Sequence, residues 1–310
     1  MEQSWWMKWA RATEHQRVLA RSTREFFATD SHEYERFDNA GDRTDPLIRM
    51  YWRLRVTRDF PPHWSVDLGD IVTNLRAALD HIFWAAVLEH SGVPAKPNLV
   101  QFPIETVLAK FERRRRDLQG LLAGDVWDVI EALQPFHGGD EAYTSPLEIL
   151  RWLSNVDKHR AVHVVGRTSI DLGPIDVDSP YPLEVVEEWH ADGPADDGAV
   201  VARLKLKRPP NRHVVDLRLA PAYVLSLPIR DDPTEYRSLS SLMQVINDKV
   251  VEALVYVSTV ANMPMPDPAE LELGEEHEAV APEFGGDVVF LTAHDGERYA
   301  MPLRSANAGT

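Results

Sequence analysis

The stretch NLRAALDHIFWAAV, residues 74–87, decides the fold because it lies at the centre of the strongest helix pattern in the chain. Over residues 65–90, apolar side chains recur at the spacing of one helix face, which predicts a long helix with one buried stripe. Ser91–Gly92 follows and is typical of a helix end. The predicted stripe consists of Leu68, Ile71, Val72, Leu75, Leu79, Ile82, Phe83 and Ala86.

Four polar residues interrupt this helix: Asn74, Arg76, Asp80 and His81. At about 100° per residue, Asn74 and His81 lie opposite the stripe, and Arg76 lies on its flank, one helical turn before Asp80. Alanines and Trp84 on the polar side indicate close packing there too, so the polar groups need partners inside the fold. Three interpretations stay open, namely a structural network, a functional pocket and a solvated face.

A second polar group stands in LSNVDKHRAVHVV, residues 153–165, where a helix predicted over 146–160 gives way to a strand. Asp157 and Arg160 project with the apolar stripe of this helix, whereas Asn155 and His159 flank Trp152. Lys158 and His159 suit the negative end of a helix dipole, so a plain C-terminal cap is an equally good interpretation. We expect this helix to pack against helix 65–90. One polar cluster would then contain Arg76, Asp80, His81, Asp157, His159 and Arg160, with His15 joining from the first helix.

The pattern along the chain predicts an α+β fold, a helical bundle packed with an antiparallel sheet. The main domain is expected over 1–262, with a helical part at 1–160, a sheet at 161–230 and a helix at 234–262. Within the helical part, residues 51–57 alternate as a half-buried strand, with Trp52 and Leu54 on one side and Arg53 and Arg55 on the other. Residues 263–310 are expected to form an acidic, Pro-rich linker and a C-terminal hairpin.

The composition of the chain limits the classes of chemistry and of partner that it allows. The chain has 310 residues, a formal net charge of −16 and no cysteine, which excludes disulfides, thiolate chemistry and Cys-ligated zinc. Residues 250–297 contain no Lys or Arg and carry 11 acidic residues. This net negative charge argues against general nucleic-acid binding but allows a local contact with RNA. The basic run Arg113–Arg116 is most simply a solvated helix face.

The N-terminal sequence has no apolar run of signal-peptide length, and no later stretch reaches the length of a membrane span by inspection. We therefore expect a cytoplasmic protein without membrane contact. No cofactor is indicated, and a homodimer is one arrangement that the sequence allows.

Several motifs occur together in order: GDIVTNLRAALDHIFW, QFPI, LQPFHGGD and PLEILRWLSNVDKHR. Their combination resembles an uncharacterised bacterial family, mainly actinobacterial, with NLRxALDH and LxNxDKHR motifs. The resemblance covers roughly residues 5–170, and RATEH, ending at His15, also fits the pattern. It implies no established activity, fold or cofactor.

Three classes of function remain open from the sequence. In the first, the polar clusters are structural, or they bind a ligand or partner. In the second, Arg76-x4-His81 is similar to the Arg-x(4–6)-His motif of HEPN-like ribonucleases, in which the histidine acts as acid or base and the arginine stabilises phosphate charge. Asp80 competes for this arginine, and Ala77 departs from the polar residue often found after it.

The third class is a metal-dependent hydrolase, in which His15, His81 and His159 bind a catalytic ion and Asp157 supports them. No HxxxH or HExxH pair accompanies these histidines. His137 and Asp140, in a Gly-rich loop, could line the mouth of the same site, although a plain turn explains them more simply. Under any enzymatic reading the catalytic candidates are Arg76, His81, His159 and Asp157. The binding candidates are Asn74, Asp80, Asn155, Lys158 and Arg160.

Overall fold

In the computed structural model the chain forms two compact units. The helical unit comprises the described residues within Met1–Ser22, Pro62–Val162 and Ser240–Thr310, and the sheet unit those within Thr23–Pro61 and His163–Leu239. The structure describes residues 3–29, 31–162, 164–169, 176–178, 184–191, 193–208, 216–218, 222–230, 235–266, 271, 288–292 and 298–302. Helices and antiparallel sheets together make an α+β fold, as predicted.

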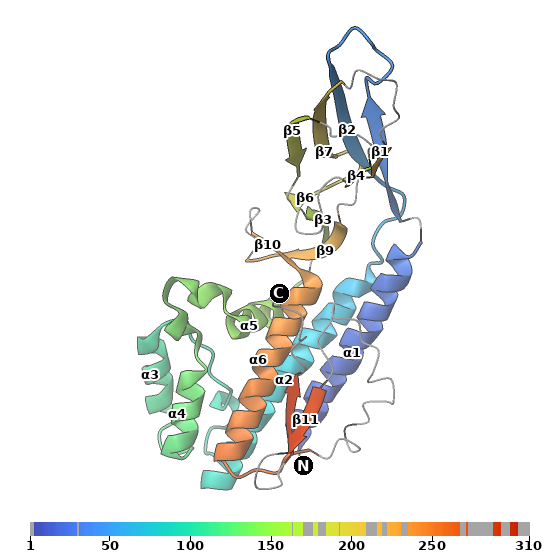
Figure 1. Cartoon of the computed structure of the whole chain (residues 1–310). Helices are drawn as coiled ribbons and strands as arrows, with labels where there is room; N and C mark the ends of the chain where they lie inside the picture. The colour runs from blue at the N-terminus through green and yellow to red at the C-terminus, as the bar shows by residue number, and fades with distance from the viewer. Residues whose placement is uncertain are drawn as a thin grey trace. The chain divides into compact units, whose positions relative to one another are not determined.

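Three long helices form the centre of the helical unit, and Figure 1 shows them side by side: α1 (Ser4–Phe27), α2 (His63–Ser91) and α6 (Leu239–Val260). Hydrogen bonds between side chains link them. Trp9 Nε1 donates to Asn247 Oδ1 at 2.9 Å between α1 and α6, and Trp64 Nε1 donates to Ser22 Oγ at 2.9 Å between α2 and α1. The predicted apolar stripe of α2 is buried throughout. This stripe is therefore the core around which the unit is built.

Shorter elements complete the helical unit. They are η1 (Pro97–Leu99), α3 (Leu108–Asp117), α4 (Gly124–Ala132), η2 (Pro135–Thr144) and α5 (Pro146–Asp157). Ser145 is the N-cap residue of α5 and sets its start. Its Oγ atom accepts the backbone N–H of Glu148, and Pro146 occupies the first helical position. Helix α5 packs on α2, as expected from the two apolar stripes.

Helix α2 is long and apolar enough to cross a membrane, whereas inspection of the sequence led us to expect no such stretch. That expectation was wrong by the test of length and composition. Of the apolar stretch of α2 that meets this criterion, 50% is buried inside the structure. A buried core helix of a folded domain meets the same test, so the finding is weak evidence for a membrane span.

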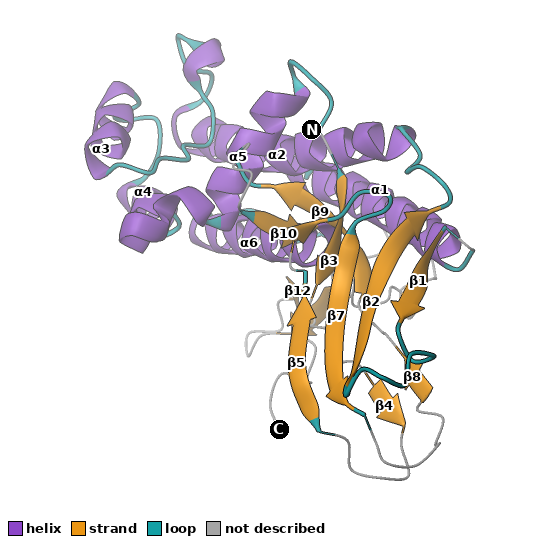
Figure 2. Cartoon of the chain, turned by 90° about the horizontal axis from the view of Figure 1, so that it is seen from above, coloured by secondary structure: helices purple, strands orange, loops and turns teal. Residues whose placement is uncertain are grey.

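The sheet unit contains a four-stranded antiparallel sheet in the order β1 (His32–Asp38), β2 (Leu47–Val56), β7 (Val200–Lys207) and β5 (Val185–His190), and Figure 2 shows these strands side by side. Alternate residues of β2 are buried, as predicted for residues 51–57. One face of the sheet therefore packs on a core, and the other carries arginine and lysine side chains. The hairpin of β1 and β2 falls inside the helical part expected over 1–160.

A second sheet of this unit has the order β10 (Tyr236–Ser238), β9 (Ala222–Pro228), β3 (Val165–Ser169) and β6 (Gly193–Pro194). A further strand pair of this unit is β4 (Asp176–Asp178) with β8 (Asp216–Arg218). The pair of β11 (Val288–Thr292) with β12 (Arg298–Pro302) belongs to the helical unit. The antiparallel pair β11–β12 agrees with the C-terminal hairpin expected from the sequence. Most of the expected acidic linker lies outside the described residues.

Candidate functional site

The site begins at the contact of α2 with α5. Gly69 lets the carboxylate of Asp157 approach the backbone of α2, because a Cβ atom at position 69 would lie 2.1 Å from Asp157 Oδ1. Thr73, one turn further along α2, donates its hydroxyl to Asp157 Oδ2 at 3.2 Å. Asp157 thus anchors the end of α5 on α2 and fixes where the rest of α5 lies.

Arg76 and Asp80 face a different neighbour, the segment Gln101–Glu105. Arg76 Nε and Nη2 donate to the two carboxylate oxygens of Asp80 at 3.2 and 2.7 Å. Arg76 Nη2 also donates to the carbonyl oxygen of Phe102 at 2.8 Å, and the N–H of Phe102 donates to Asp80 Oδ1 at 2.9 Å. The pair therefore pins an extended segment to α2 and is held in one orientation by it.

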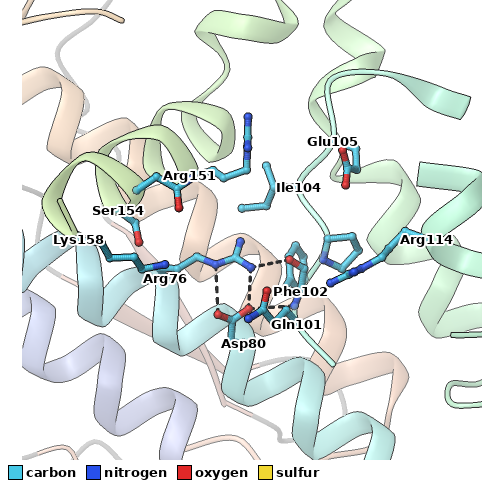
Figure 3. Close-up of a pocket in the computed structure, with 12 residues that line it drawn as sticks. Arg76, Asp80, Gln101, Phe102, Ile104, Glu105, Arg114, Arg151, Ser154 and Lys158 are labelled. Atoms are coloured by element: carbon cyan, nitrogen blue, oxygen red, sulfur yellow. Dashed lines mark hydrogen bonds and ion pairs between the residues drawn. The ribbon is translucent and has the colours of Figure 1, made fainter. Parts of the chain in front are cut away.

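One nitrogen of this guanidinium is left over. Arg76 Nη1 is buried and has no hydrogen-bond partner among the residues that the structure describes, whereas Nε and Nη2 both have one. Figure 3 shows the guanidinium with this third nitrogen on the side of Ile104, away from Asp80. Burial lowers the pKa of Arg76, the positive charges of Arg151 and Arg114 lower it further, and Asp80 acts in the opposite direction. An arginine so placed keeps its charge and has a donor without an acceptor.

A cavity of about 220 Å³ surrounds this pair, and we call it the Arg76 pocket. Its lining comprises Arg76, Asp80, Gln101–Glu105, Arg114, Arg151, Ser154, Asn155 and Lys158, from α2, α3, α5 and the segment 101–105 (Figure 3). Four of these side chains are positively charged and two, Asp80 and Glu105, are negatively charged, so the formal charge of the lining is +2. The pocket is a small, mainly polar and positively charged cavity.

Arg151 repeats the arrangement seen for Arg76. Its Nε and Nη2 atoms donate to the two carboxylate oxygens of Glu148, both at 2.6 Å, and the side chain of Glu148 is fully buried. Hydrogen bonding to Glu148 raises the pKa of Arg151 and outweighs the opposing effect of burial. In both arginines one edge of the guanidinium is fixed by a carboxylate on the same helix, which orients the remaining nitrogen.

The pocket brings together some of the predicted site residues. Arg76 and Asp80 from α2 line it with Asn155 from α5 and with Lys158, the residue that follows α5. Asp157 also lies at the contact of α2 with α5, but its partner is Thr73, and it does not line the pocket. His159 and Arg160 are exposed beyond the end of α5. The expected cluster is therefore only partly formed, because α5 ends at Asp157 and the last two residues leave its buried face.

His81 and Asn74 face α1 instead of α5. His81 Nδ1 lies 3.1 Å from Ser4 Oγ, and Lys8 Nζ donates to Asn74 Oδ1 at 3.3 Å. Burial lowers the pKa of His81, and the nearby charge of Lys8 lowers it further, against the effect of Asp80. Five residues of α-helix turn a side chain by about 500°, so Arg76 and His81 point about 140° apart. The two residues of the HEPN-like motif thus have different neighbours in this chain.

The candidate metal site is not assembled. Across the part of the chain that the structure describes, which includes His15, His81 and His159, no three His, Asp or Glu residues are grouped as a metal ion requires. These histidines lie on α1, on the α1-facing side of α2 and beyond the end of α5. His137 contacts the carbonyl oxygen of Glu131 at 2.9 Å, and neither it nor Asp140 lines the Arg76 pocket.

Sequence reasoning missed Arg114, Arg151 and the segment 101–105 as parts of the site. The segment was visible as the QFPI motif, and Arg114 belongs to the basic run of α3. Arg151 gave a weaker signal, because a Glu and an Arg three residues apart on a helix are usually a solvated pair. The full burial of Glu148 shows that this pair is not of that kind.

No protein-family model, curated protein or solved structure matches this chain. The resemblance to a family with NLRxALDH and LxNxDKHR motifs therefore stays a prediction.

Proposed function

We propose that the helical unit binds a small anionic ligand in the Arg76 pocket, with Arg76 as the central contact. One observation carries the proposal, the buried Nη1 of Arg76 without a hydrogen-bond partner. A buried charged donor without an acceptor costs free energy, which a ligand oxygen at hydrogen-bond distance recovers. Lys158 is an exposed, long side chain that can shift to admit such an oxygen.

The charge of the pocket supports an anion. The lining has a formal charge of +2 although the whole chain has a net charge of −16. Guanidinium groups recognise carboxylate and phosphate oxygens through several directed N–H donors, and two guanidiniums here are already oriented by Asp80 and Glu148. Little side-chain ordering is then left for the ligand to impose, which favours binding.

The size of the cavity limits the ligand. At about 220 Å³ the pocket is smaller than the range of roughly 300–1,000 Å³ that is typical for drug-sized ligands. It suits the phosphate or carboxylate group of a small molecule, with the rest of that molecule small or directed to solvent. The proposed function is therefore the binding of a small phosphate or carboxylate compound.

Isothermal titration calorimetry with inorganic phosphate tests the proposal, with chloride at matched ionic strength as the reference. We expect saturable binding to the native chain, and we expect Lys158→Gln to weaken it severalfold, because this variant removes one charge of the pocket. Arg113→Gln is the matched control, since Arg113 is an exposed α3 residue outside the pocket. Equal affinities for the native chain and both variants, or no heat above the chloride reference, would contradict the proposal.

A further inference from the structure

A row of side chains crosses the exposed face of the four-stranded sheet in the sheet unit. The strand register pairs Phe37 of β1 with Tyr51 of β2, Tyr51 with Arg203 of β7, and Arg203 with Trp189 of β5. Directly paired residues of a sheet point to the same face, so these four side chains form one line across all four strands. We call this line, together with Arg53, the aromatic–arginine row.

The rings and guanidiniums of the row are in contact. Phe37 and Tyr51 are stacked, with ring centroids 5.0 Å apart and planes 12° from parallel. The guanidinium carbon of Arg53 lies 5.3 Å from the Phe37 ring and 5.4 Å from the Tyr51 ring, and that of Arg203 lies 4.9 Å from the Trp189 ring. Phe37 is 37% and Trp189 40% exposed, so solvent reaches both ends of the row.

Other basic residues around the row have acidic partners. They are Arg49 with Asp45, Arg55 with Glu35 and Asp197, Lys205 with Glu187, and Lys207 with Glu184. Arg53 and Arg203 make no ion pair with any residue that the structure describes, although Glu35 lies opposite Arg53 in the strand register. These two arginines therefore stand beside exposed aromatic rings without an ion pair of their own.

We infer that this row binds a short single-stranded nucleic acid. Bases stack on aromatic rings and on guanidinium planes whatever their sequence, and arginines beside the rings pair with backbone phosphates. The rings of Tyr51 and Trp189 stand on strands two spacings apart, about 10 Å, with Arg203 on the strand between them. This arrangement accommodates two bases at the two ends of the row, with a phosphate at Arg203 and another at Arg53.

A duplex fits the row less well. Its bases are stacked on each other and paired, so they present no free faces to the rings. The net charge of −16 further restricts the contact to the few nucleotides that the row can reach. The inferred site belongs to the sheet unit and is independent of the anion proposed for the Arg76 pocket.

Fluorescence anisotropy of a labelled six-nucleotide oligothymidylate, titrated with the full chain at several salt concentrations, tests the inference. Two phosphate contacts predict a slope of about −1.4 for the logarithm of the binding constant against that of the salt concentration. Arg203→Ala should bring the slope to about −0.7, whereas Lys207→Ala, on the same strand and already ion-paired, should change it less.

Aromatic variants separate stacking from charge. Trp189→Ala should weaken binding about tenfold and Trp189→Phe only slightly, because the phenyl ring still stacks. Tyr256→Ala, which removes an exposed aromatic ring from α6, is the matched control and should bind as the native chain does. Three results would each overturn the inference: no binding of the oligonucleotide at low salt, equal affinity of Trp189→Ala and Tyr256→Ala, or tighter binding of a duplex of the same length.

Discussion

Asp80 binds Arg76 through both carboxylate oxygens and accepts the backbone N–H of Phe102 through one of them. Arg76 in turn donates to the carbonyl oxygen of Phe102. One ion pair on α2 thereby satisfies both polar backbone groups of a residue whose ring is buried in the core. The same two side chains also line the Arg76 pocket. The stability of this region and the proposed binding site therefore depend on the same pair.

Replacing Asp80 alone should destabilise the protein strongly. Asp80→Ala leaves the largely buried guanidinium of Arg76 without its counter-ion, and breaking a buried pair in this way costs about 3 kcal/mol or more. Urea denaturation followed by circular dichroism measures the change. The double variant Arg76→Met with Asp80→Leu should recover part of the lost stability, because no charge is then left unpaired, whereas the N–H and carbonyl groups of Phe102 still lack the partners that the pair supplied. A loss under about 0.5 kcal/mol for Asp80→Ala would mean that the pair is effectively solvated.

Gly69→Ala should separate the end of α5 from α2. The new Cβ atom would lie 2.1 Å from Asp157 Oδ1 and 2.8 Å from its Cγ, so the carboxylate must move and its bond with Thr73 is lost. We expect a loss of about 1–3 kcal/mol in the free energy of unfolding, as for other overpacked sites. Gly124→Ala is the control, because nothing lies within 4 Å of a Cβ there. Equal stabilities of the two variants would refute the close approach of Asp157.

Stability should fall as the pH drops below the ordinary pKa of histidine. Burial and Lys8 hold the pKa of His81 below its model-peptide value of 6.5. The unfolded chain therefore binds the proton more readily, and the free energy of unfolding decreases as the pH falls from about 7 through 6.5. Burial lowers the pKa of His32 as well, which acts in the same direction.

His81→Gln should reduce this pH dependence, because it removes an imidazole whose protonation favours the unfolded chain. Urea midpoints measured between pH 5.5 and 7.5 check the prediction. A steeper loss of stability toward low pH in His81→Gln than in the native chain would show that the sign of the effect is wrong.

Periodicity predicted the elements well because burial repeats along each helix and strand. The helix expected over 65–90 is α2, His63–Ser91. The sequence also alternates over residues 200–207, with Val201 on the same side as the arginine and lysines, which predicts a strand there, and that strand is β7. The alternation failed at Val201 itself, which is buried. The register of β2 and β7 shifts between Trp52 and Arg53, opposite this residue. A register shift depends on the partner strand, which a local pattern does not contain.

The candidate site was predicted only in part, because a local sequence pattern does not contain the helices that pack around it. Helical spacing placed Arg76 beside Asp80, and the apolar stripes predicted that α5 would pack on α2. Spacing alone could not show that α1 covers the side of α2 that carries His81, or that α5 ends before His159. Arg151 was overlooked because the burial of its partner Glu148 depends on the fold around α5.

We propose that an anion supplies the hydrogen-bond partner that Arg76 Nη1 lacks among the described residues. A crystal structure of the native chain grown in the presence of phosphate tests this most directly. We predict a phosphate in the Arg76 pocket with one oxygen about 2.7–3.2 Å from Nη1. A pocket without phosphate, in which Nη1 donates to a protein group or an ordered water, would contradict the account.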